Sequence, residues 1–67
     1  MIIKWINKYS REEGFVKSVD LKQRHFNNTF DKAEAKVYGN KGAAAKVVKA
    51  LIDFGEGENN DFEIVSA

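Results

Sequence analysis

The segment from Asn40 to Gly55 constrains the fold more than any other stretch, because it has the pattern of one amphipathic helix with both ends marked. Asn40 stands at the N-cap position, where its side chain can accept hydrogen bonds from the free amides of the first turn. Gly55 stands just past the expected end, where a left-handed residue closes a helix. The i, i+3, i+4, i+7 spacing of one buried face is followed by Ala44, Val47, Val48 and Leu51. A helix with a single apolar stripe needs a second layer against it, and the rest of the chain must provide that layer.

Other stretches are rich in β-branched and aromatic residues and are predicted to be strands: residues 2–9, 15–21, 25–30 and 62–66. Residues 10–14, which end in Gly14, and residues 22–24 are predicted turns, and residues 56–61 a flexible acidic connector. Residues 31–38 fit either one helical turn or an extended run. The order β-β-β-α-β predicts a single α+β domain over residues 1–67, in which one amphipathic helix packs on a three- to four-stranded, mainly antiparallel sheet.

Alternation along the strands predicts which side chains share a face of the sheet. The predicted sets are Ile3 with Trp5, Phe15 with Val19 and Leu21, Phe26 with Phe30, and Phe62 with Ile64. Ile2 and Ile6 fall on the opposite face of the first strand, so both faces of that strand are expected to be covered. Phe26 and Phe30 are predicted to point inward, and Asn27 and Thr29 outward.

The net charge of +1 hides an uneven distribution along the chain. Residues 1–52 contain all eleven Lys and Arg and five acids, whereas residues 53–67 contain five acids and no base. Two interpretations remain open: an ordinary solvated surface whose charges interleave in space, or a bipolar surface that orients a charged partner.

The N-terminal residues lack the pattern of a signal peptide, and no apolar stretch approaches the ~18 residues that span a bilayer. The chain has no Cys, which excludes disulfides and thiolate metal sites. We therefore expect a cytoplasmic protein without a membrane partner.

The residue inventory argues against an enzyme. His25 is the only histidine, Cys is absent, and the three serines lie in no nucleophile motif. The paired carboxylates Glu12-Glu13 and Glu56/Glu58 fall in predicted loops, where a solvated acidic surface is the ordinary interpretation. Residues 56–61 offer oxygen ligands, but their spacing does not match a calcium-binding EF-hand loop. We expect no catalytic residues, no metal and no cofactor.

The entry to the helix is a candidate anion site. Free amides and the helix dipole attract negative charge there, and the residues concerned are Asn40, Lys41 and Gly42. The P-loop pattern is not met, and the alternative is that Gly39 and Gly42 simply let the chain turn into the helix.

Nucleic acid is a second candidate partner. Basic and aromatic residues alternate in the predicted strands, and a sheet of that kind can hold single-stranded nucleic acid. The predicted contacts are Lys4, Lys17, Lys22 and Arg24, with stacking by Trp5 or Tyr9. Against this hypothesis, the overall charge is far from strongly basic.

Protein–protein interaction is the first hypothesis, with another protein or a second copy as the partner. The first strand supplies more apolar surface than one helix can cover, through Ile2, Ile3, Trp5 and Ile6. Such a surplus predicts an interaction face buried in a homodimer or against a different protein.

About half of the chain, residues 32–65, resembles a strand-helix-strand cassette. The similarity rests on Ala35-Lys36-Val37-Tyr38, Asn40-Lys41-Gly42-Ala43-Ala44, Leu51 and Phe62-Glu63-Ile64-Val65. The cassette is similar to one found in small phage and prophage proteins of Gram-positive bacteria. The resemblance implies a cytoplasmic accessory protein of a mobile element and brings no catalytic residue with it.

Overall fold

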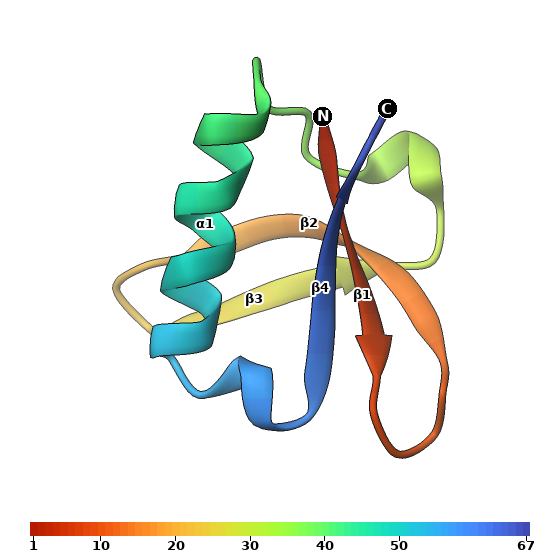
Figure 1. The fold of residues 1–67 in the computed structure, drawn as a ribbon, viewed down its shortest axis with the longest axis vertical. Helices are drawn as coiled ribbons and strands as arrows, with labels where there is room; N and C mark the ends of the chain where they lie inside the picture. The colour runs from red at the N-terminus through yellow and green to blue at the C-terminus, as the bar shows by residue number, and fades with distance from the viewer.

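The structure is a computed structural model that describes all residues from 1 to 67. Four strands, one α-helix and two 3₁₀ turns follow one another in the chain (Figure 1). The elements are β1 (Ile2–Asn7), β2 (Glu13–Asp20), β3 (His25–Thr29), η1 (Lys32–Glu34), α1 (Lys41–Asp53), η2 (Glu56–Glu58) and β4 (Asn60–Val65). The predicted α+β class and the β-β-β-α-β order are confirmed. Residues 31–38 contain both alternatives, since the single turn η1 is followed by an extended stretch.

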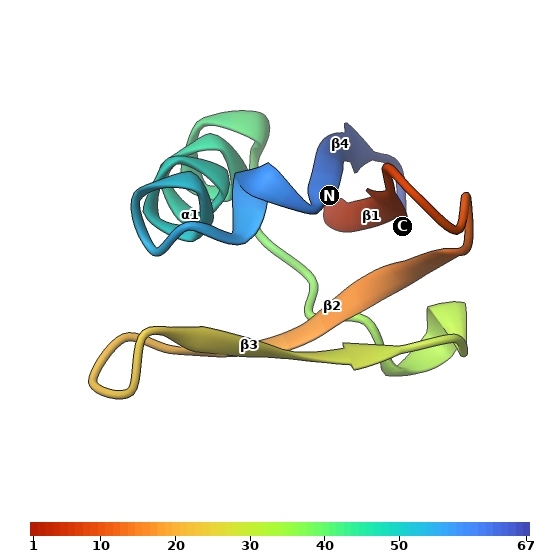
Figure 2. The ribbon, with the colours of Figure 1, turned by 90° about the horizontal axis from the view of Figure 1, so that it is seen from below.

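The four strands form one antiparallel sheet in the order β3-β2-β1-β4. The sheet is curled, and the ribbon of β2 and β3 crosses beneath β1 and β4 (Figure 2). The curl brings the two edge strands together on the concave side, where the rings of Phe26 in β3 and Phe62 in β4 meet edge-on at 5.8 Å. The curled sheet thus forms half of a barrel. The helix α1 lies beside β4 and closes the open side of this half-barrel.

The core lies between the concave face of the sheet and α1. Its buried members come from three elements and are Ile3, Trp5, Val16, Ala44 and Leu51. Val47 and Val48 pack against this cluster, so the predicted apolar stripe of the helix faces the sheet as expected. Ile2, on the other face of β1, is also buried, which agrees with the expectation that β1 is covered on both faces.

The ends of α1 have the predicted chemistry. The side-chain Oδ1 of Asn40 accepts from the amide of Ala43 at 2.8 Å, and Gly55 adopts a left-handed backbone with φ of 94°. The stretch after Gly55 differs from the prediction, because residues 56–58 form the turn η2 rather than a flexible connector.

An irregularity in β2 overturns one predicted face. Val16 pairs with Asn28, but Asn27 pairs with Ser18, so Lys17 is an extra residue on β2. Such a bulge shifts the alternation by one residue. As a result Val16 and Val19 both face the core, whereas Leu21 falls in the turn and remains 69% exposed. The prediction that Phe15, Val19 and Leu21 share one face is therefore wrong.

The end of β3 also differs from the prediction. Phe30 lies edge-on to Trp5 at 5.7 Å but stays 66% exposed, so it does not enter the core. Thr29 is buried, because its hydroxyl accepts from the amide of Asp31 at 3.0 Å and donates to Glu34 at 3.1 Å. The turn η1 thus covers a side chain that alternation alone places in solvent.

Gly14 has a different role from the expected one. It lies inside β2 opposite Trp5 rather than in the hairpin loop, where Arg11 takes the left-handed conformation. A Cβ atom on Gly14 would stand 2.5 Å from Cζ2 of Trp5 and 2.9 Å from the carbonyl oxygen of Thr29. The missing side chain therefore makes room for the indole ring, which lies across β2.

Replacing Gly14 with alanine should destabilise the fold by about 2 kcal/mol, because a buried ring and a backbone carbonyl would both have to move. Chemical denaturation followed by the fluorescence of Trp5 measures this. Gly39→Ala is the matched control, since a Cβ there meets no atom within 4 Å, and its unfolding free energy should stay within about 0.5 kcal/mol of the parent. Equal stability of the two variants would show that the indole does not depend on this space.

Candidate functional site

The predicted apolar interaction surface is not on the surface. Ile2 and Ile3 are almost completely inaccessible, and Trp5 is 7% exposed. Ile6 alone keeps partial exposure. The physical reason is the position of β1, which pairs with β2 on one side and β4 on the other. The apolar side chains of this central strand are covered on both faces of the sheet, so they do not form an exposed patch.

The predicted nucleic-acid contacts do not gather into one site. Trp5 is buried and its Nε1 donates to the carbonyl of Phe15 at 3.2 Å, which leaves no free face for stacking. Lys4 lies 3.0 Å from the carboxylate of Glu13, and this hydrogen bond raises the pKa of Lys4. Lys17 lies 3.6 Å from Glu34. Two of the predicted cations are therefore already paired with acids.

The remaining predicted contacts lie at opposite ends of the sheet. Tyr9 is exposed in the β1–β2 hairpin, whereas Lys22 and Arg24 belong to the β2–β3 turn (Figure 1). Arg24 donates to the carbonyl of Asp53 at 3.2 Å, and its guanidinium lies 5.4 Å over the ring of Phe54. This arginine holds the β2–β3 turn against the end of α1, so its side chain has a structural role in the fold.

The candidate anion site is explained by helix capping. Asn40, Lys41 and Gly42 are all exposed, and the carboxamide oxygen of Asn40 is used by the amide of Ala43. The asparagine therefore caps its own helix through the amide of Ala43, and the anion site stays a prediction.

An open groove lies between α1, β2 and the extended stretch that leads into α1, and we call it the basic groove. Its volume is about 490 Å³, and it is lined by Ser18, Val19, Leu21, Lys36, Tyr38, Lys46, Val47 and Ala50. Most of these residues are apolar, two are lysines and none is acidic. The groove thus combines an apolar floor with positive charge.

Three separate segments build the basic groove. The bulge in β2 turns Val19 inward and leaves Leu21 at the rim. The amide of Lys36 donates to the carbonyl of Val16 at 3.0 Å, which fixes the extended stretch beside β2. Tyr38 is then held by a pair of main-chain hydrogen bonds with Met1, at 2.7 and 2.9 Å.

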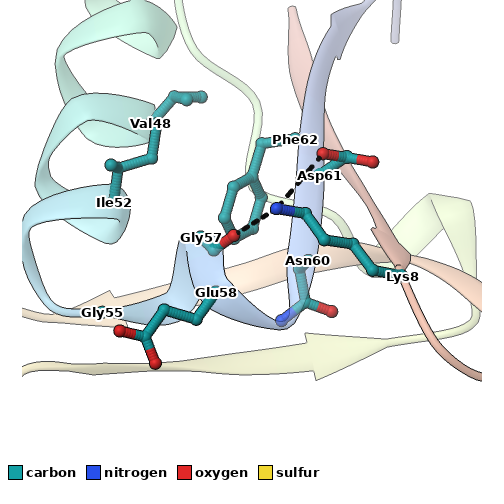
Figure 3. Close-up of a pocket in the computed structure, with 9 residues that line it drawn as sticks. All are labelled: Lys8, Val48, Ile52, Gly55, Gly57, Glu58, Asn60, Asp61 and Phe62. Atoms are coloured by element: carbon teal, nitrogen blue, oxygen red, sulfur yellow. Dashed lines mark hydrogen bonds and ion pairs between the residues drawn. The ribbon is translucent and has the colours of Figure 1, made fainter.

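A second hollow of about 450 Å³ lies on the other side of α1, next to β4 (Figure 3). We call it the acidic hollow. It is lined by Lys8, Val48, Ile52, Gly55, Gly57, Glu58, Asn60, Asp61 and Phe62. Its one cation is engaged within the protein, because Nζ of Lys8 donates to the carbonyl of Gly57 at 2.7 Å and lies 3.8 Å from Asp61.

A smaller hollow of about 260 Å³ lies between β1, β3, η2 and the start of β4, and it is lined by Trp5, Asn7, Phe26, Asn28, Glu56 and Asn60. No three His, Asp or Glu side chains gather closely enough to hold a metal ion. None of the helices has the length and apolar character that crossing a bilayer requires.

Sequence reasoning missed the basic groove. Its members are far apart in the chain, and Leu21 is predicted to share a face with Phe15 and Val19. The available signal was Lys46 beside Val47 and Ala50, which places a cation at the margin of the apolar helix stripe.

Comparisons with protein-family models, with curated proteins and with solved structures found no match.

Burial in the basic groove raises the pKa of Tyr38. The stability that the neutral phenol contributes is fully present below the ordinary tyrosine pKa and is lost as the pH rises from there through the raised pKa, because the unfolded chain releases its proton first. A spectroscopic titration of phenolate in the Tyr9→Phe variant, whose only tyrosine is Tyr38, should show a midpoint above the ordinary value. A midpoint at or below it would mean that the phenol is solvated.

Proposed function

We propose that this protein is a non-enzymatic interaction protein of a phage or prophage, which binds an acidic and apolar segment of a partner protein in the basic groove. The observation that carries the proposal is the lining of this groove, where the exposed Leu21 and four half-buried apolar side chains stand beside two lysines and no acid. The resemblance of residues 32–65 to small phage and prophage proteins supports an accessory role in the host cytoplasm.

The groove has the size and chemistry of a peptide-binding site. Its volume of about 490 Å³ is within the range of roughly 300–1,000 Å³ typical of ligand sites. Leu21 exposes most of its side chain at the rim, so an apolar partner residue would remove it from water. Burial of apolar area of this kind provides the main driving force of association.

The two lysines give the groove its selectivity. Lys36 lies in the extended stretch and Lys46 on α1, so they flank the apolar floor from two elements. Neither forms an ion pair within the protein. Carboxylates of a bound segment can pair with both, whereas a basic segment would place like charges together.

Single-stranded nucleic acid, the other partner predicted from the sequence, lacks such a site. Trp5 is inaccessible, and Lys4 and Lys17 are paired with acids. The basic groove offers phosphate two cations but no exposed face of a large aromatic ring other than the half-buried Tyr38. Nucleic acid is therefore the main competing outcome of the test.

Selection from a display library of random linear peptides should yield binders rich in acidic and apolar residues. Their affinity should fall at least about tenfold in the double variant Lys36→Glu/Lys46→Glu, because opposite charges become like charges. Lys32→Glu/Lys41→Glu changes the net charge equally outside the groove and should bind like the parent protein. Leu21→Ser should also weaken binding without unfolding the protein, since this side chain is exposed.

Two results would contradict the proposal. One is selection of peptides without acidic residues, or of peptides whose affinity is unchanged in the groove variants. The other is tighter binding of fluorescently labelled single-stranded oligonucleotides, lost in Lys36→Glu/Lys46→Glu and steeply dependent on salt, which would establish the nucleic-acid function instead.

A further inference from the structure

The strand β4 has one unpaired edge. It is the last strand of the sheet, with β1 on one side and no strand on the other (Figure 2). The hydrogen bonds of β1 show which backbone groups face that open side. The amide of Asn7 donates to Glu12 toward β2, whereas the amide of Lys8 donates to Asn59 toward β4.

Backbone groups of successive strand residues point to opposite sides, so the direction of the others follows. Counting back from Lys8, Ile6 and Lys4 also point toward β4, and they pair with Asp61 and Glu63. The groups of Phe62 and Ile64 therefore point away from β1. No hydrogen bond outside the sheet reaches either residue, which leaves two amides and two carbonyls free at this edge.

The surroundings of this edge have a definite chemistry. The acidic hollow borders it, with Val48, Ile52 and Phe62 as its apolar members (Figure 3). Glu58 and Asp61 line the hollow and are exposed. Residues 53–67 contain no base, and Lys8 is already held by Gly57 and Asp61. Free backbone groups, an apolar floor and negative charge thus coincide at one place.

We propose that β4 accepts an additional strand from a partner protein, an extended segment in which apolar and basic residues alternate. Its residues opposite Phe62 and Ile64 would share their face and lie over Val48 and Ile52. Its neighbouring residues would lie on the other face with Asp61 and Glu63, whose carboxylates would attract lysine or arginine in addition to Lys8 and Lys4 on that face. Main-chain hydrogen bonds supply the affinity, and the alternating side chains supply the selectivity.

A second copy of this chain is a poor occupant of the edge. Pairing of two β4 strands would bring Asp61 and Glu63 of one copy against the same acids of the other, and like charges opposite each other in a sheet are destabilising. β4 itself contains no proline, no lysine and no bulge that would block strand addition. The helix α1 lies beside this edge, and the acidic hollow lies between the two elements. The two acids of β4 leave the edge open to a basic strand only.

The added strand is independent of the proposed function. It lies on the opposite side of α1 from the basic groove and requires a partner segment of opposite charge. Failure of one site in its own test leaves the other unaffected.

The test uses a capped synthetic peptide of alternating valine and lysine, with a valine–glutamate peptide as the control. Amide hydrogen exchange of the intact protein, measured by NMR, should show fast exchange at Phe62 and Ile64 in the free state. The lysine peptide should slow both amides at least about tenfold at saturation, and the glutamate peptide should not. The variant Asp61→Asn/Glu63→Gln should bind the lysine peptide about tenfold more weakly, whereas Glu12→Gln in the β1–β2 loop should change the affinity by less than about twofold.

Each of three results would overturn the proposal. The first is no binding of the lysine peptide at low salt. The second is binding without protection at Phe62 and Ile64, which would show non-specific ionic binding. Protection at Asn28 of β3 instead would show that the peptide uses the other edge of the sheet. The third is protection of these amides by raised protein concentration alone, with a dimer in sedimentation, which would make a second copy the occupant.

Discussion

The contact of the Trp5 ring with Gly14 is the interaction on which the rest of the structure depends. The indole lies across β2, its nitrogen donates to Phe15, and Phe30 meets it edge-on. Trp5 is the largest side chain of the core, and in the neighbouring strand β4 it pairs with Phe62. The ring of this β1 residue therefore contacts β2 and the residue that follows β3, and its backbone lies opposite β4. A domain of 67 residues has few such contacts, since a chain of this size buries only about 60% of its unfolded surface.

The curl that surrounds this ring also creates the two candidate sites. Because the edge strands meet through Phe26 and Phe62, one short helix suffices to close the core. The helix cannot also fill the margins on both of its sides, and a hollow remains at each. The margin toward β2 contains cations and the margin toward β4 contains acids. Cations and acids that are separated along the sequence thus also lie on different sides of α1. Lys4 and Lys8 are exceptions, because they lie next to acids near β4.

The sequence predicts those parts of the fold that rest on local chemistry. Asn40 and Gly55 define the helix because capping depends on a few neighbouring residues. The bulge at Lys17 was not predictable, because period-two alternation assumes an unbroken ladder and nothing local marks the extra residue. The burial of Ile2 and Ile3 follows from the central place of β1, which is a property of strand order rather than of these residues. The basic groove was missed for the same reason, since Leu21, Tyr38 and Val47 become neighbours only in the folded chain.

Local charge, rather than net charge, decides what each side of the helix can bind. The net charge of +1 predicts almost no attraction to any partner. Electrostatic interactions at the surface, however, are screened beyond about 8 Å at physiological salt, and the molecule extends over 29 × 24 × 17 Å. An α-helix with its side chains is about 10 Å wide, so a segment in the basic groove is separated from the acidic hollow by more than the screening length. On the two proposals, Lys36 and Lys46 would act on the segment in the groove while Glu58 and Asp61 would act on the strand added to β4, and a nearly neutral chain presents two surfaces of opposite charge.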